Sequence, residues 1–306
     1  MSNPPTPRVV SLLPGGTEIV LALGAGDELV GLSHLCHGPE GRALARVLST
    51  RVDSQAWSMQ RIDAELRAAF ASGAPLYDLD EQAIRALEPT HVISQGLCPV
   101  CAVTPESVAP ALRGRCAELL VLSPHSLADV ARDMRTVGAA LGRAEAGERA
   151  ARAFERAIEA VRELPRLAPV PRVGVLEWFE PLWASGEWIA EMVEAAGGGP
   201  VLARADETSK RITWEELVAA DPDVVVLAAC SMSIARTERE LGALFDRPEW
   251  AGLRAVRAER VFLIDGERHA STPGPGLAEG AEVLADLLRA PPSAESPRWK
   301  RLPAPR

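Results

Sequence analysis

Short apolar runs alternate with helical segments along almost the whole chain, and this alternation constrains the fold more than any other feature. In the first half, strands are expected at Val9–Leu13, Leu29–Leu32, His91–Ser94 and Glu118–Leu122. Helices are expected between them at Thr17–Leu23, Asp63–Ser72 and Asp80–Leu87. Strands that alternate with helices indicate βαβ units and a mainly parallel sheet.

A second alternating set follows one long helical stretch. Helical periodicity at Ser126–Leu141 stops at Gly142, and a second run at Glu145–Leu164 contains no proline before Pro165. Later strands are expected at Val173–Glu177, Val224–Ala229 and Val261–Ile264. The expected fold is α/β, with two Rossmann-like lobes of mainly parallel sheet joined by one long spine helix. We expect an N-terminal lobe, a connecting helix, a C-terminal lobe and a poorly ordered tail at residues 1–142, 143–166, 167–292 and 293–306.

Composition and charge exclude several classes of protein. The 306 residues, of which 47% are hydrophobic, are enough for two domains. A net charge of −9 argues against a nucleic-acid surface, which needs a basic patch. We expect no membrane insertion, because no run approaches the ~20 apolar residues of a spanning helix. The first residues carry no basic and apolar signal pattern, so the chain is expected to be cytoplasmic, or periplasmic if an export signal precedes it.

Four motifs, taken in order, resemble the cobalamin-binding and iron-siderophore-binding proteins of ABC importers. They are the opening Val9–Gly24, two helix-to-strand turns at Leu87–Ile93 and Ala220–Val226, and the late strand Arg260–Asp265. The resemblance extends over about residues 8–290. It implies two lobes on a helical spine, a small-molecule metal chelate held in the cleft between them, and an ABC permease as partner. It also implies permease docking through an acidic residue on each lobe, at Glu215 and at Glu81 beside Gln82.

Cysteines follow several of the expected strands. Cys36, Cys98 with Cys101, and Cys230 each lie just beyond an apolar run. Ligands of open α/β sheets bind outside the carboxyl ends of the strands, so these thiols are predicted to converge on one site. The spacing of Cys98 and Cys101 lets two thiolates reach one metal ion, and His34 is a further candidate ligand. Zn²⁺, an Fe–S cluster or the cobalt of a corrinoid would suit such ligands, whereas the alternative is that these cysteines are small buried core residues.

Two further groups are candidate ligand contacts. Trp178 and Trp188, with Glu177, lie near a strand exit and a helix entry, where flat aromatic faces suit a planar or macrocyclic ligand. His269 precedes a Gly-Pro run that enters the last helix. The first strand-to-helix turn is predicted to offer amide groups to the ligand, and Thr17 is alternatively a helix cap. That turn consists of Ser11, Pro14, Gly15, Gly16 and Thr17.

The residues support two hypotheses about function. The first is a non-enzymatic binding protein that closes two lobes around a corrinoid or other metal chelate, with the cysteines on the ligand's metal or on a metal of their own. The second is a cytosolic metal-dependent or thiol redox enzyme on the same scaffold, with Cys98 and Cys101 as the active pair. Nucleophilic hydrolysis has little support, because no Gly-x-Ser-x-Gly motif is present.

Overall fold

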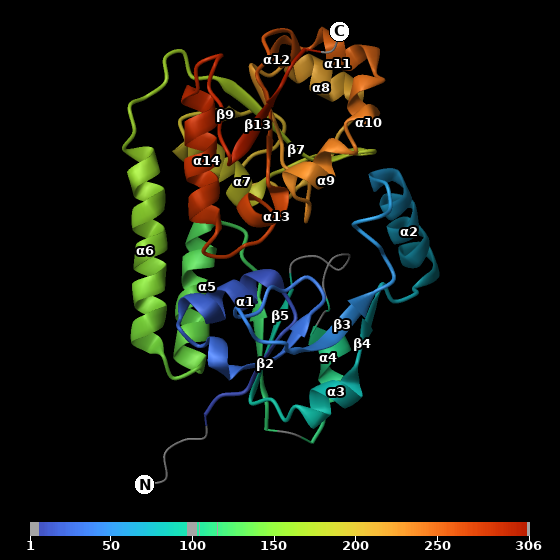
Figure 1. Cartoon of the computed structure of the whole chain (residues 1–306), viewed down its shortest axis with the longest axis vertical. Coiled ribbons are helices and arrows are strands. Elements are labelled where there is room, and N and C mark those ends of the chain that lie inside the picture. The colour runs from blue at the N-terminus through green and yellow to red at the C-terminus, as the bar shows by residue number, and fades with distance from the viewer. Residues whose placement is uncertain (1–5, 97–102, 104, 115, 305–306) are drawn as a thin grey trace. The chain divides into compact units, whose positions relative to one another are not determined.

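The computed structural model describes residues 6–96, 103, 105–114 and 116–304 (Figure 1). Contacts divide the chain into two compact units. Unit 1 consists of Met1–Asp53, Glu65–Pro124 and Ala128–Ala153. Unit 2 consists of Ser54–Ala64, His125–Leu127 and Phe154–Arg306. The chain therefore passes between the units several times, and each unit is described below by itself.

Unit 1 is built on a six-stranded sheet in the order β4-β3-β2-β1-β5-β6. The strands are β1 (Val9–Ser11), β2 (Leu29–Ser33), β3 (Ala45–Thr50), β4 (Tyr77–Leu79), β5 (His91–Gln95) and β6 (Glu118–Leu122). All neighbours are parallel except β3 and β4, which are antiparallel. The carboxyl ends of β1, β2 and β5 therefore lie at one edge.

Helices cover this sheet because both faces of a parallel sheet are apolar. The helices of this part of the chain are α1 (Pro14–Ala22), α2 (Met59–Ser72), α3 (Glu81–Ala86), α4 (Pro105–Leu112), α5 (Leu127–Ala140) and α6 (Ala144–Arg162), with a short 3₁₀ turn at Gly26–Glu28. On one face, Val10 and Val92 share a core cluster with Ile84 of α3 and Val108 of α4. The helices α2 and α6 each contain residues of both units.

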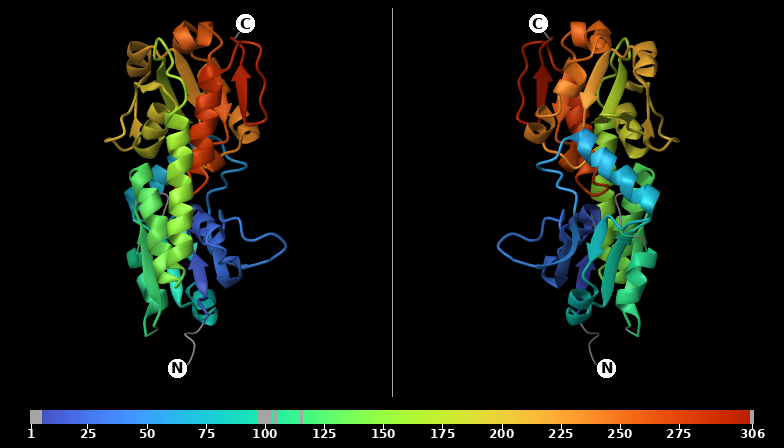
Figure 2. Two further views of the ribbon diagram at one scale, coloured as in Figure 1. Left: turned by 90° about the vertical axis from the view of Figure 1, so that its left-hand side faces the viewer. Right: turned by 90° about the vertical axis from the view of Figure 1, so that its right-hand side faces the viewer.

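Helices α5 and α6 lie side by side, as both views in Figure 2 show, and touch through two glycines. A Cβ atom on Gly138 would lie 2.7 Å from the Cα of Gly147, and one on Gly147 would lie 2.8 Å from the carbonyl oxygen of Met134. Both obstacles are backbone atoms, which cannot rotate away. The crossing of these helices therefore requires glycine at both positions.

Unit 2 contains a second sheet, whose central strands are parallel. Its strand order is β10-β8-β7-β11-β12-β13, with β9 also paired to β7. The strands are β7 (Arg172–Phe179), β8 (Leu182–Ala184), β9 (Gly199–Pro200), β10 (Lys210–Arg211), β11 (Val224–Leu227), β12 (Val261–Ile264) and β13 (Trp299–Leu302). The central strands β7, β11 and β12 are parallel, and their interior residues are buried on both faces. The helices are α7 (Glu187–Ala195), α8 (Trp214–Ala220), α9 (Ile234–Glu238), α10 (Gly242–Phe245), α11 (Pro248–Gly252), α12 (Arg254–Arg257), α13 (Gly266–His269) and α14 (Leu277–Arg289).

The C-terminal tail differs from its expected disorder. Its strand β13 pairs antiparallel with β12, and Trp299 is buried edge-on against Phe262 with ring centroids 5.3 Å apart. The indole Nε1 of Trp299 also donates a hydrogen bond of 2.9 Å to Asp286. The prediction of a disordered tail was wrong. It rested on the many prolines and charges of the tail, whereas Trp299 packs against Phe262 and the tail pairs with β12.

The predicted fold class is confirmed: two sheets whose pairing is mostly parallel overall, each flanked by helices, and a long helix α6 at the expected place. The structure adds six strands that sequence analysis did not predict, namely β3, β4, β8, β9, β10 and β13. Among the described residues, no helix has both the length and the apolar character needed to cross a bilayer.

Gly138→Ala should destabilise the protein. Alanine would gain ~1 kcal/mol in helix propensity over glycine, but overpacking against a fixed backbone costs about 1–3 kcal/mol, and a contact of 2.7 Å lies at the upper end of that range. Urea denaturation measures the change. Gly252→Ala is the control, because no atom lies within 4 Å of its added Cβ, and equal midpoints for both variants would contradict the steric argument.

Candidate functional site

The carboxyl edge of the unit 1 sheet is closed by its own side chains. The Thr17 hydroxyl donates to Ser11 Oγ at 2.9 Å, and Ser11 Oγ donates to the carbonyl of Leu13 at 3.0 Å. Cys36 Sγ lies 3.1 Å from Ser33 Oγ and donates to the Ser11 carbonyl at 3.7 Å. Ser11, Thr17, Ser33 and Cys36 are all buried. These polar groups satisfy one another within the protein.

The first strand-to-helix turn also packs inward. Pro14 begins α1, so Thr17 lies inside the helix and does not cap it. Gly15 and Gly16 are buried, and a Cβ on Gly16 would lie 2.7 Å from Ile93 Cγ2. Glycine at position 16 is therefore explained by close packing of α1 on β5. Ligand binding by this turn stays a prediction.

The proposed cysteine metal centre is not supported by the described residues. Cys36 is 1% exposed and is a core residue, so its expected position at an open site is wrong. Cys98 and Cys101 lie outside the described residues, and within the described part no group of three or more His, Cys, Asp or Glu side chains is arranged to hold a metal ion. Cys36 follows β2 as expected, but its side chain turns toward Ser33 and the core.

His34, the other candidate metal ligand in this region, is half-buried beside the core. Its Nδ1 has no hydrogen-bond partner among the described residues, and its ring centroid lies 6.0 Å from that of Tyr77. Burial lowers the pKa of His34, and the charge of Arg46 lowers it further. His34 is therefore neutral at pH 7 and belongs to the same closed edge.

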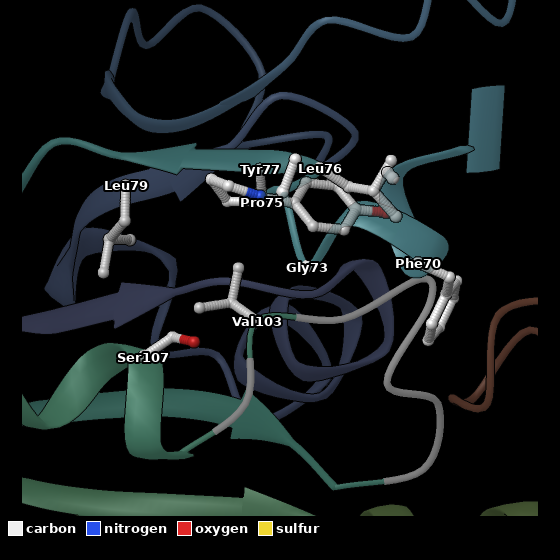
Figure 3. A pocket seen from close by; sticks show the side chains of 10 residues that line it. Phe70, Gly73, Pro75, Leu76, Tyr77, Leu79, Val103 and Ser107 are labelled. Atoms are coloured by element: carbon white, nitrogen blue, oxygen red, sulfur yellow. The ribbon is translucent and has the colours of Figure 1, made fainter. Parts of the chain in front are cut away.

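A small pocket opens elsewhere on unit 1, between the end of α2, β4 and the start of α4 (Figure 3). Its volume is about 260 Å³, and its walls are mainly apolar. Phe70, Tyr77, Leu79 and Val103 line it, together with Ser107. Sequence analysis missed this pocket because β4 itself was not predicted.

In unit 2 the carboxyl edge carries a fixed carboxylate. Glu177 lies on β7 where the pairing with β8 is irregular, and the residue is half-buried. Its Oε2 accepts hydrogen bonds of 3.0 Å from the hydroxyls of both Ser185 and Ser209. Two hydroxyl donors on one oxygen orient the carboxylate before any ligand arrives. Sequence analysis singled out Glu177 but missed Ser209, which is far away in sequence and lies in a loop.

Cys230 lies beside the main chain of Glu177, just after the neighbouring strand β11. Its amide donates to the carbonyl of Glu177 at 3.0 Å, and the residue is half-buried. Ser231 follows with a positive φ of 56°, and its amide donates to Ser271 Oγ at 2.9 Å. The expected position of Cys230 at a strand end is therefore observed, with a serine-rich surround.

The two tryptophans predicted to contact a ligand have different environments. Trp178 is half-buried, and its Nε1 donates to the carbonyl of Glu180 at 3.2 Å. Trp188 is only 8% exposed, and its Nε1 donates to the carbonyl of Ala270 at 2.8 Å. Trp188 therefore packs in the core of unit 2, and Trp178 is the better placed of the two to meet a ligand.

His269 lies at the end of α13 and is 4% exposed. A Cβ on Gly280 of α14 would lie 2.1 Å from its carbonyl oxygen, so the two helices are in close backbone contact here. Burial lowers the pKa of His269, although Glu279 and Asp265 raise it in part. Its Nδ1 has no partner among the described residues. His269 is a neutral residue of the helix interface.

The two glutamates expected to dock a permease differ in the partners of their carboxylates. Glu81 is paired with Arg85 at 2.9 Å, one turn along α3. Glu215 is exposed in the first turn of α8, where hydrogen bonds from its own amide and from Thr213 lower its pKa. Glu215 therefore carries a charge held in place at a helix start.

Known proteins resemble this chain over most of its length. The sequence profile described as periplasmic binding protein matches residues 9–267. The vitamin B12-binding protein of Vibrio parahaemolyticus is 24% identical over 268 residues, which is 82% of each chain. Among solved structures, the apo heme-binding protein RhuT from Roseiflexus sp. RS-1 is 25% identical, with a TM-score of 0.69 over 93% of this chain and 100% of that one. The vitamin B12 binding protein BtuF of Vibrio cholerae, at 20% identity, shares the fold with a TM-score of 0.65 over 93% of this chain and 97% of that one.

The contribution of His269 to stability should fall as the pH drops through about 6.5, because folded His269 resists protonation and the unfolded chain does not. The unfolded state then binds more protons, so acid favours unfolding. His34 contributes with the same sign. Urea unfolding at pH 7.5 and about 5.5 should show a smaller acid loss in His269→Gln than in wild type. His37→Gln, at an exposed position, should retain the full loss; equal losses in all three proteins would refute the assignment.

Proposed function

Because the chain belongs to the periplasmic binding protein family, we propose that it binds a corrinoid or other metal chelate and presents it to an ABC permease. The names of its relatives, a vitamin B12-binding protein and a heme-binding protein, support this ligand class. The family consists of binding proteins, and the two sheets of this chain follow its fold. The location expected from the sequence, cytoplasmic or, with a preceding export signal, periplasmic, stays a prediction.

The oriented carboxylate of Glu177 is the observation that carries the choice of a corrinoid. The rim of a corrinoid bears amide groups, which donate hydrogen bonds to a carboxylate, whereas the rim of heme bears anionic propionates. Glu180 adds a second carboxylate just after β7. Like charges facing one another disfavour binding, so this edge of unit 2 suits an amide-rimmed ligand better than an anionic one.

Trp178 supplies the apolar part of the same surface. A half-buried indole whose Nε1 is already hydrogen-bonded to Glu180 presents a ring at little further ordering cost.

Glu215 is proposed as the permease contact of unit 2, because it is exposed and charged. The weaker candidate is Glu81, whose carboxylate is already shared with Arg85.

Cyanocobalamin should bind the purified protein, and Trp178→Ala should weaken that binding about 10-fold, which corresponds to ~1.4 kcal/mol of lost ring contact. Isothermal titration calorimetry measures both. Trp214→Ala is the matched control. Trp214 is also half-buried in unit 2, but it lies on α8, and the guanidinium of Arg247 stacks over its ring. Absence of cyanocobalamin binding by wild type would defeat the proposed function.

Glu177→Gln should change the selectivity of the protein. The amide can still receive the serine hydroxyls, but the negative charge is lost, so binding of cyanocobalamin should fall about 5-fold while binding of hemin should improve. The ratio of the two dissociation constants is the measurement. Glu163→Gln, an exposed site in the same unit, should leave the ratio unchanged. An unchanged ratio in Glu177→Gln would remove the charge argument.

A further inference from the structure

Residues 54–64, which we call the strap, leave the unit 1 part of the sequence and pack in unit 2. We propose that the strap forms one wall of the ligand-binding edge of unit 2 and that Arg236 is the positioning residue that holds it there. The ligand class of this wall rests on the proposed function. The fixation of the strap by Arg236 is independent of that function.

Arg236 lies in α9, and its side chain is only 3% exposed. Its Nε donates to the carbonyl of Ser54 at 2.9 Å, and its Nη2 donates to the carbonyl of Trp57. Its Nη1 pairs with Glu240 one turn later, whose side chain is 10% exposed. One guanidinium thus binds two strap carbonyls and a carboxylate at once.

Three further contacts fasten the strap along its length. The Met59 amide donates to Glu240 Oε2 at 3.0 Å, and Met59 itself is buried. Arg239 donates to the carbonyl of Gln55 at 2.8 Å. Gln60 Nε2 donates to Glu180 Oε1 at 3.1 Å. Glu240 therefore links Arg236 to the strap, with one carboxylate oxygen on the guanidinium and the other on the Met59 amide.

A simple connection between β3 and α2 would not need a buried ion pair. Burial of two charges is costly unless both are fully hydrogen-bonded, and such pairs are best explained where they fix one arrangement among several. A lysine cannot replace this arginine, because only the planar guanidinium reaches three acceptors in fixed directions. The arrangement therefore specifies the position of the strap.

The two anchors of the strap place it at the ligand edge. Helix α9 begins seven residues after β11 ends, and Glu180 directly follows β7. Strands β7 and β11 are adjacent and parallel, so their carboxyl ends lie together. A segment fastened to both of these connections lies at the carboxyl edge, where ligands of such sheets bind.

The strap brings suitable chemistry to this edge. Trp57 is half-buried, and the guanidinium of Arg61 stacks 3.9 Å from its ring centroid. Gln60 meets Glu180, whose carbonyl accepts the Nε1 of Trp178. An indole face and an amide at this position suit a large ring system with polar substituents. We therefore infer that Trp57 contacts the ring of the ligand.

Hydrogen exchange with mass spectrometry on the full chain tests the position of the strap. In Arg236→Lys, exchange at residues 54–60 should rise about 10-fold or more, because the lysine loses the two carbonyl contacts. The matched control is Arg247→Lys, an exposed arginine of unit 2 that pairs with Glu249, and exchange of the strap should match wild type there. Equal exchange in Arg236→Lys and wild type would overturn the role of Arg236.

Calorimetry with cyanocobalamin tests the wall itself. Trp57→Ala should fold normally, keep its strap protected from exchange and bind about 10-fold more weakly. Trp214→Ala should bind as wild type does. Binding by wild type with unchanged affinity in Trp57→Ala would overturn the wall alone. No binding by wild type would overturn the proposed function and the wall, while the exchange result would still decide the role of Arg236.

Discussion

Parallel pairing of the central strands is the constraint on which the rest of this structure depends. A parallel pair needs a crossover between its strands, and helices must then cover both faces of the sheet. The faces of both sheets are therefore covered by packed helices, and every residue of β11 and β12 is buried. What remains for function is the edge where the strands end and their connections begin.

The two units use that edge in opposite ways. In unit 1 the side chains that follow the strands are short and bond to each other, with Arg46 donating to the carbonyls of Ser33 and Cys36 at 2.6 Å each. In unit 2 the corresponding positions carry Glu177, Trp178 and Cys230, all half-buried. The first pattern stabilises loops, and the second leaves a carboxylate and an indole half-buried, which is the basis of the proposed ligand contacts.

Sequence alone predicted the central strands well, but it missed most outer strands and predicted the side-chain directions poorly. Apolar runs such as Val224–Ala229 mark buried strands because no other segment is so uniformly apolar. The position of Cys36 after β2 was likewise predictable, but a residue in a loop can turn to either side, and Cys36 turned inward. Ser209 and the strap depend on contacts between distant parts of the chain, which leave no local pattern. The spacing of Arg236 and Glu240, one helical turn apart, does not reveal the strap either, because such pairs are common on exposed helices.

Burial distinguishes this pair from an ordinary surface pair. An exposed arginine and glutamate at this spacing contribute little, whereas a buried pair that lacked further partners would be costly. Here the Nε and Nη2 atoms of Arg236 each donate to a strap carbonyl, and the second oxygen of Glu240 accepts the Met59 amide. The pair and the strap therefore satisfy each other: without the strap, Arg236 and Glu240 would remain a buried charged pair with unmet hydrogen bonds. This mutual dependence is why a segment that begins in the unit 1 part of the sequence is structurally a part of unit 2.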